Sequence, residues 1–182
     1  DLREILSEYD DLTASLLARR GIASREAAEA FLAPSYEEHI SDPMQIMDMG
    51  TAAARIAQAI DSGERITVWS DYDCDGIPGG VLLHDFFTAI EYTNFENYIP
   101  HRHEEGYGFN AGSGPAFKER DAKLIITVDC GSTDHAGVEK ASELGIDVIV
   151  TDHHEPSETL PPAYAVINPK RDNAYPFNGI CG

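Results

Sequence analysis

The chain has 182 residues, of which 42% are hydrophobic and 25% are charged, a composition typical of a globular protein. Acidic residues outnumber basic ones by 32 to 13, and the net charge of −19 argues against a general nucleic-acid-binding surface. The same charge suits a site that gathers divalent cations, and a salt-adapted host would also explain it. No apolar run is long enough to span a bilayer, and the first residues lack the basic start and apolar block of a signal peptide.

The cysteines indicate a reducing, cytoplasmic compartment. Cys74, Cys130 and Cys181 are odd in number, lie far apart and form no CxxC pair, so a disulfide framework is not expected. We expect each of them to be a small buried residue without a redox role.

Residues 1–64 are predicted to form a helical N-terminal extension that supports packing. Ser24 is expected to cap a helix that Pro34 ends. Asp48 is expected to cap a second helix that ends at Gly63. The apolar stripe of this second helix consists of Ala52, Ala53, Ile56 and Ile60.

From residue 65 onwards, short apolar runs rich in β-branched residues are mostly separated by helical segments. The runs cover residues 66–70, 95–99, 124–128, 147–151 and 163–167, and the helical segments cover residues 78–90, 114–121 and 134–144. This alternation predicts an α/β domain over residues 65–182, with a parallel, Rossmann-like sheet flanked by helices.

Acidic residues and histidines follow three of these predicted strands. Asp71 follows the first strand, Asp129 follows the third, and the residues 152–154, Asp-His-His, follow the fourth. Because open α/β sheets bind ligands at the carboxyl ends of their strands, we expect these side chains to meet there.

The first of these loops resembles the start of an EF-hand calcium site. Asp71, Asp73 and Asp75 alternate and are followed by Gly76. An EF-hand, however, needs a helix before the loop and a Glu at its twelfth position, which is Leu82 here. The loop is therefore predicted to join a strand to a helix.

In that arrangement Pro78 is the expected first residue of the helix, and Gly79 and Gly80 leave room for a phosphate at its positive end. Carboxylates beside such a site would repel a phosphate unless metal ions lay between them. Oxygen and imidazole ligands favour Mn²⁺ or Mg²⁺, and two ions can promote a phosphoryl displacement. Asp129 is the expected bridge between them, because its neighbours Cys130 and Gly131 leave it uncrowded.

The motifs DYDCDG (71–76), VDCG (128–131) and TDHH (151–154) resemble those of the DHH phosphoesterase superfamily. The segment YIPHRHEEGYGFN (98–110) is similar to that of its RecJ branch, the single-strand-specific 5′→3′ DNA exonucleases. Residues 20–34, and the stretches INPKR and YPF within residues 167–177, match this branch as well. The resemblance implies a role in DNA repair and recombination, with single-stranded DNA as substrate and single-strand-binding or repair proteins as possible partners.

The resemblance also implies roles for the motif residues. Asp73 would ligate one metal ion, Asp75 the other, and Asp129 would bridge the two. His153 would complete the second site, and Asp71 would be a ligand or would support one.

His154 would contact the scissile phosphate, and Asp152 would orient a neighbouring histidine. Arg102 would hold a DNA phosphate, or would pair with Glu104 or Glu105. Tyr107 and Phe109 are more plausible as packing residues than as base-stacking ones.

Two departures from the family pattern stand out. Trp69 occupies the position where many members have a histidine ligand, and we expect it to be a core residue. A further aspartate ligand and a second domain, both typical of the family, are expected beyond Gly182, so this piece alone is expected to be poorly active.

Two other functions stay open at this stage. One is a DHH phosphodiesterase acting on short oligonucleotides or cyclic dinucleotides. The other is a catalytically silent relative that serves as a scaffold.

Overall fold

A computed structural model describes residues 8–113, 117, 119–171, 175 and 180. The chain divides into two compact units, Asp1–Asp42 and Pro43–Gly182. Whereas the sequence suggested a boundary after residue 64, residues 43–64 belong to the second unit, because the helix within them packs against a strand of the sheet.

The first unit consists of short helices. They are α2 (Asp11–Arg19), α3 (Arg25–Leu32) and α4 (Tyr36–His39). Ser24 caps α3 as predicted, since its hydroxyl accepts a hydrogen bond from the N–H of Ala27. Leu17 and Ala28 form the small core of this unit.

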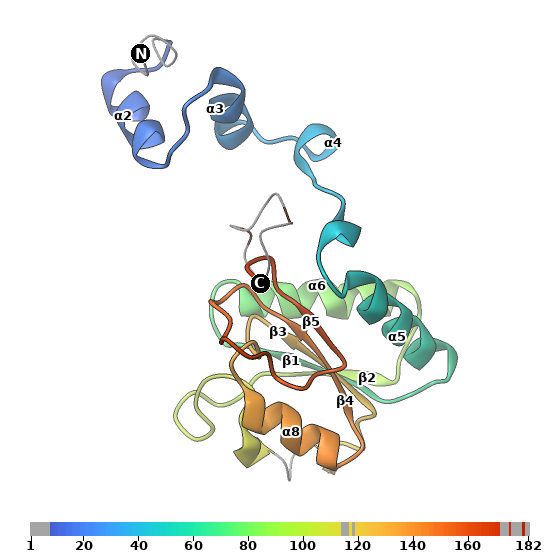
Figure 1. The fold of residues 1–182 in the computed structure, drawn as a ribbon. Helices are drawn as coiled ribbons and strands as arrows, with labels where there is room; N and C mark the ends of the chain where they lie inside the picture. The colour runs from blue at the N-terminus through green and yellow to red at the C-terminus, as the bar shows by residue number, and fades with distance from the viewer. Residues whose placement is uncertain (1–7, 114–116, 118, 172–174, 176–179, 181–182) are drawn as a thin grey trace. The chain divides into compact units, whose positions relative to one another are not determined.

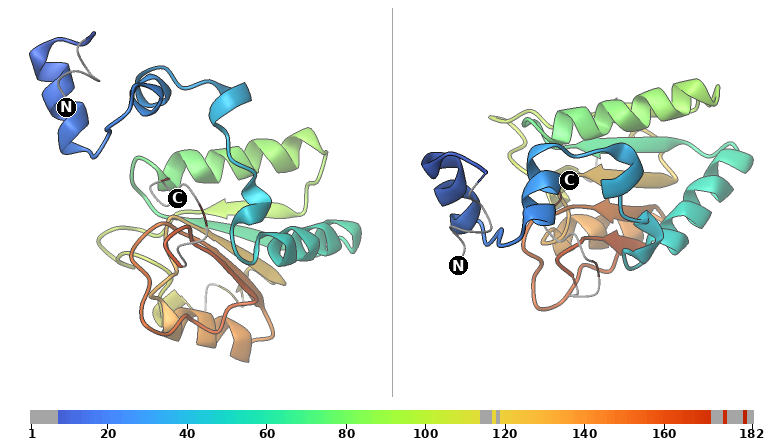
Figure 2. Two further views of the ribbon diagram at one scale, coloured as in Figure 1. Left: turned by 45° about the horizontal axis from the view of Figure 1, so that its top comes forward. Right: turned by 90° about the horizontal axis from the view of Figure 1, so that it is seen from above.

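The second unit is a five-stranded parallel sheet with helices on both faces, as predicted. It contains, in chain order, η1 (Pro43–Gln45), α5 (Met49–Asp61), β1 (Ile66–Ser70), α6 (Gly76–Ala89), β2 (Phe95–Tyr98), η2 (Ala111–Ser113), β3 (Leu124–Val128), α8 (His135–Glu143), β4 (Asp147–Thr151) and β5 (Ala165–Ile167). The strand order is β2-β1-β3-β4-β5. Helices α5 and α6 cover one face and α8 covers the other (Figures 1 and 2).

The predicted strands, and the helices expected over residues 78–90 and 134–144, agree with these bounds to within two residues at each end. The last strand is shorter than expected, and α6 begins at Gly76, so Pro78 lies within the first turn. The earlier start arises because the Asp73 carboxylate accepts hydrogen bonds from the N–H groups of Asp75 and Gly76. Half of the residues of the helix expected over residues 114–121 lie outside the described residues.

Each face of the sheet has its own hydrophobic core. Ile66, Val68 and Phe87 belong to the core under α5 and α6. Trp69 belongs to the core on the other face, is fully buried, and donates from Nε1 to the carbonyl of Gly108 over 3.3 Å. The indole therefore serves packing, as expected.

Asp48 and the stripe on α5 differ from expectation. Asp48 precedes α5 but does not cap it, because its carboxylate accepts from the N–H of Val166 and from Arg171 instead. Ala53 is exposed, while Arg55 on the same helix is buried. The partners of Asp48 and Arg55 lie on other parts of the fold, so the spacing of apolar residues along the helix could not reveal them.

Of the three cysteines, Cys130 is buried and free as predicted, whereas Cys74 is exposed at the surface loop before α6. Cys181 lies outside the described residues. Among the described helices, none combines the length and the apolar character needed to cross a membrane.

Candidate metal centre

The strand register places the predicted site residues in one row. Ser70, Val128 and Thr151, the last residues of β1, β3 and β4, are paired neighbours across the sheet. Asp71, Asp129 and Asp152 directly follow them, and the N–H of each continues the ladder to the adjacent strand. The aspartates therefore meet at the carboxyl edge of the sheet, as parallel strands require.

Asp129 lies at the centre of this row. Its φ of 61° is a left-handed conformation, which is uncommon for an aspartate and marks a constrained turn directly after β3. The side chain is fully buried. Burial raises the pKa of Asp129 to about 7, and the neighbouring carboxylates of Asp73 and Asp75 act in the same direction.

Asp71, Asp73 and Asp129 form the first group with the geometry of a cation site. One carboxylate oxygen from each lies within 4.8 Å of the others. Hydrogen bonds from the Gly76 N–H and from Asp75 lower the pKa of Asp73 to about 2 despite some desolvation, so this carboxylate is ionised. Burial raises the pKa of Asp71.

The second group forms around the histidines. Asp129, His153 and His154 each offer a ligand atom within 4.8 Å of the others. Nε2 of His153 lies 3.0 Å from Oδ1 of Asp129 and 3.3 Å from Oδ2 of Asp75. Asp129 thus belongs to both groups, as expected of a bridging carboxylate.

The Asp152 carboxylate is saturated with hydrogen bonds. It accepts from the N–H groups of Ser132, His153 and His154, and its Oδ1 lies 2.8 Å from Nδ1 of His154. Burial opposes ionisation, but these bonds lower the pKa of Asp152 below its ordinary value. An ionised acceptor at this distance keeps a proton on Nδ1 of His154, so Nε2 is the nitrogen left to contact another group.

The donor set fits divalent cations. Oδ1 of Asp71 and both carboxylate oxygens of Asp129 are buried and accept no hydrogen bond of regular geometry from the described residues, although Nε2 of His153 lies 3.0 Å from Oδ1 of Asp129. Buried polar atoms without partners are rare and costly, and a bound cation would satisfy all three. Carboxylate and imidazole ligands without thiolate suit Mn²⁺ or Mg²⁺.

The predicted substrate-binding residues have different surroundings. Arg102 is exposed beside the cluster, with its guanidinium 4.3 Å from the centre of the Tyr72 ring. Gly79 is half-buried. Gly80 faces the sheet, where a Cβ atom would lie 2.2 Å from Oγ of Ser70, so its missing side chain already has a packing reason.

Three further residues touch the site. The hydroxyl of Tyr107 lies 3.3 Å from the carbonyl oxygen of Asp129 and 3.4 Å from Nδ1 of His154, whereas Phe109 is fully buried in the core as expected. Ser132 and Asn168 are buried and hydrogen bonded to the loop that carries His154. In the sequence, only the position of Asn168 directly after a predicted strand could have indicated that it contacts the loop of His154.

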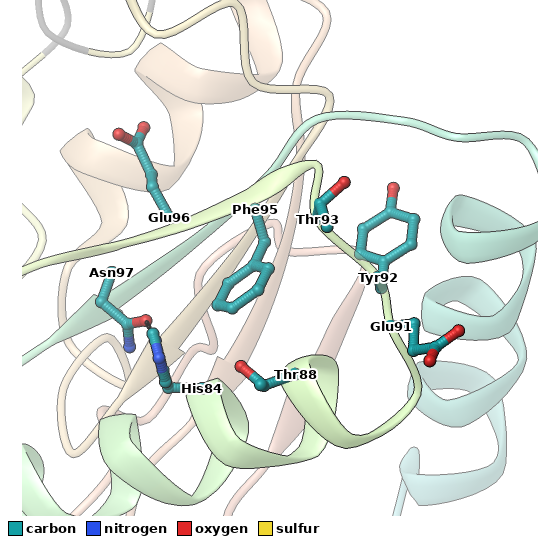
Figure 3. Close-up of a pocket in the computed structure, with 8 residues that line it drawn as sticks. All are labelled: His84, Thr88, Glu91, Tyr92, Thr93, Phe95, Glu96 and Asn97. Carbon is teal, nitrogen blue, oxygen red and sulfur yellow. Dashed lines mark hydrogen bonds between the residues drawn. The ribbon is translucent and has the colours of Figure 1, made fainter.

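A groove of about 540 Å³ lies elsewhere, between α6 and the edge strand β2 (Figure 3). It is lined by His84, Thr88, Glu91, Tyr92, Thr93, Phe95, Glu96 and Asn97. None of these residues was predicted to be functional, and His84 lies 3.0 Å from Oδ1 of Asn97, as expected of a satisfied helical histidine.

Comparison with known proteins gives consistent results. The chain is 42% identical over 173 residues to the single-stranded-DNA-specific exonuclease RecJ of Bacillus subtilis, covering 94% of this chain and 22% of that protein. It is 38% identical to RecJ of Escherichia coli, covering 99% of this chain and 32% of that protein. The chain thus spans about a fifth to a third of the length of these relatives.

Solved structures agree with these relatives. A crystal structure of exonuclease RecJ bound to manganese has a TM-score of 0.67 and 38% identity, covering 74% of this chain and 34% of that one. RecJ from Thermus thermophilus in complex with Mn²⁺ also has a TM-score of 0.67, with 29% identity, covering 96% of this chain and 24% of that one. Residues 65–182 match the DHH family, N-terminal domain, and the chain therefore belongs to the DHH family.

Proposed function

We propose that this chain is the catalytic DHH part of a metal-dependent exonuclease that degrades single-stranded DNA from its 5′ end. Repair and recombination are its proposed roles, and the cytoplasm its proposed location. The observation that carries the proposal is the pair of ligand groups that share the buried Asp129. The relatives in Bacillus subtilis and Escherichia coli are named as single-stranded-DNA-specific exonucleases, and this supports the substrate class.

Two cations would be held by the residues already described. Asp71, Asp73 and Asp129 would hold one ion, and Asp129, His153 and Asp75 the other. When bound, the ions would supply positive charge at the phosphate and activate water. The manganese in the related RecJ structures makes Mn²⁺ the first ion to test.

The remaining groups would act on the substrate. Burial opposes the charged form of His154, but the bond to the Asp152 carboxylate raises the pKa of His154 overall, so the side chain would act as an imidazolium. Nδ1–H would donate to Asp152, and Nε2–H would donate to the scissile phosphate and stabilise the negative charge of the transition state. Arg102 would bind a neighbouring phosphate of the strand. Water would supply the oxygen that bonds to phosphorus, the P–O3′ bond would break, and the 3′ oxygen would take up a proton, which releases a 5′-mononucleotide.

The acidic chain offers little positive charge to guide the rest of the strand, since only 13 of its residues are Lys or Arg. We infer that other parts of the longer protein supply that surface. Single-strand-binding or repair proteins are the proposed partners.

The test uses the full-length protein that carries this chain, with Mn²⁺ and two substrates: a long 5′-phosphorylated single strand and a dinucleotide. We expect mononucleotides from the long strand. Cleavage of the dinucleotide alone would instead assign the protein to the phosphodiesterases of short oligonucleotides. Calorimetric titration with Mn²⁺ tests the scaffold alternative. If the protein is only a scaffold, it should show no Mn²⁺ binding that is lost on the substitution Asp129→Ala.

A further inference from the structure

A fourth residue belongs to the row at the carboxyl edge of the sheet. Thr151 of β4 pairs with Ile167 of β5, and Asn168 directly follows Ile167. Asn168 therefore stands beside Asp152 as Asp152 stands beside Asp129. It is 2% exposed, so its amide must find its partners inside the protein.

The partners of the Asn168 amide lie on two separate loops. Its Nδ2 donates to Oγ of Ser132 over 2.8 Å and to the carbonyl oxygen of His154 over 2.9 Å. Its Oδ1 accepts from the N–H of Lys170 over 2.9 Å. Both amide donors are thus used, and each ties β5 to a loop that follows another strand.

These bonds close a ring around His154. The N–H of Ser132 donates to Oδ2 of Asp152 over 2.9 Å, and Oδ1 of Asp152 accepts from the N–H of His154 over 3.1 Å. The backbone of His154 is therefore held on both sides, its N–H by Asp152 and its carbonyl by Asn168. Because the ring Asn168–Ser132–Asp152 is buried, water cannot easily replace any of these bonds.

We propose that Asn168 is a positioning residue for His154, acting through this ring to hold its imidazole beside the metal centre, where Nδ1 lies 3.8 Å from Oδ1 of Asp129. The inference rests on the proposed function, in which His154 contacts the phosphate. Hydrogen bonds that orient a group at a metal site typically change activity by about 10- to 100-fold when removed. A mere turn after β5 would need only the bond that Oδ1 of Asn168 accepts from the N–H of Lys170.

The test compares three variants of the full-length protein. Asn168→Ala removes both donors, and Ser132→Ala removes the hydroxyl of the ring while keeping its backbone bond to Asp152. Asn94→Ala is the matched control, because Asn94 is an exposed asparagine with two hydrogen bonds at the opposite edge of the sheet, one to the carbonyl of Gly63 and one from Arg65.

For Asn168→Ala we expect kcat to fall about 10- to 100-fold with KM within about threefold and Mn²⁺ binding retained. Ser132→Ala should have a smaller effect, and the double variant should lose less than the product of the two single losses. Asn94→Ala should leave kcat unchanged. A folded Asn168→Ala protein with kcat within about twofold of the wild type would overturn the inference.

A second readout is independent of nuclease activity. In ¹⁵N-labelled histidine spectra recorded without Mn²⁺ at alkaline pH, where the imidazole is neutral, His154 of the wild type should show one dominant tautomer with the proton on Nδ1. Asn168→Ala should mix the tautomers or broaden this signal, and an unchanged signal would overturn the inference. Failure of the wild type to degrade any single strand would refute the proposed function, while the spectra would still decide on Asn168.

Discussion

The two edges of the parallel sheet differ in whether side chains of the protein neutralise their buried charges. At the amino edge, Arg55 is buried, yet two of its guanidinium nitrogens contact carboxylates, Glu64 over 2.6 Å and Asp147 over 2.7 Å. At the carboxyl edge, Oδ1 of Asp71 and both carboxylate oxygens of Asp129 are also buried, but they accept no hydrogen bond of regular geometry from the described residues.

The difference shows what each edge is built for. At the amino edge, two carboxylates neutralise the buried charge of Arg55, although its third nitrogen, Nη1, has no hydrogen-bond partner among the described residues. At the carboxyl edge, carboxylates from loops after different strands gather without an Arg or Lys ion pair among the described contacts. An imbalance of this kind is the electrostatic signature of a cation site.

The largest expected effect comes from removing the shared carboxylate. Asp129→Asn should lower the affinity for Mn²⁺ by at least about 100-fold, because both ligand groups contain this residue. The metal-free variant should be more stable than the metal-free wild type at pH 8 by at least about 1 kcal/mol, since an uncompensated buried charge disappears. Calorimetric titration and denaturant unfolding measure the two effects, and a less stable metal-free variant would contradict this view of the carboxyl edge.

At the amino edge, the expected change in stability has the opposite sign, and no change in metal affinity accompanies it. Arg55→Met should destabilise the protein by about 3 kcal/mol, because Glu64 and Asp147 lose their cation while one of them is largely buried. The Mn²⁺ affinity should not change. Lys140→Met is the control, since its pair with Glu143 is exposed and should contribute less than about 0.5 kcal/mol. Equal losses of unfolding free energy in the two variants would show that the buried ion pairs of Arg55 stabilise the protein no more than the exposed pair of Lys140.

The smallest effect concerns a carboxylate that does have a cation. Burial would raise the pKa of Asp48, but hydrogen bonds from Arg171 and from the Val166 N–H outweigh it and lower the pKa. A lowered pKa means that the ionised form stabilises the fold above pH 4 and that this contribution disappears as the pH falls through the folded-state value. Asp48→Asn should therefore cost about 1 kcal/mol at pH 7.

The pH dependence provides the check on Asp48. The difference in unfolding free energy between the wild type and Asp48→Asn should narrow as the pH falls from about 5 to below 3. Denaturant unfolding at a series of pH values measures it. A difference in unfolding free energy that stays constant down to pH 2 would show that the charge of Asp48 does not contribute to stability.

Much of the fold and of the candidate site was readable from local pattern. The alternation of apolar strands and helices predicted the parallel sheet, because burial on both faces makes such strands continuously apolar. The position of Asp71, Asp129 and Asp152 directly after strands predicted that they would meet, because parallel strands end at a common edge. Asp129 and His153 do meet, over 3.0 Å.

The tertiary structure alone decided which residues far apart in the chain contact each other. Asn168 reaches Ser132 across 36 positions, and Tyr107 reaches His154 across 47. Asp48 was assigned by the sequence to a helix cap, yet it bonds Val166, 118 positions away. The sequence determined which residues end each strand, since that depends on local periodicity. The partners of those residues depend on strand order and register, which no local pattern contains.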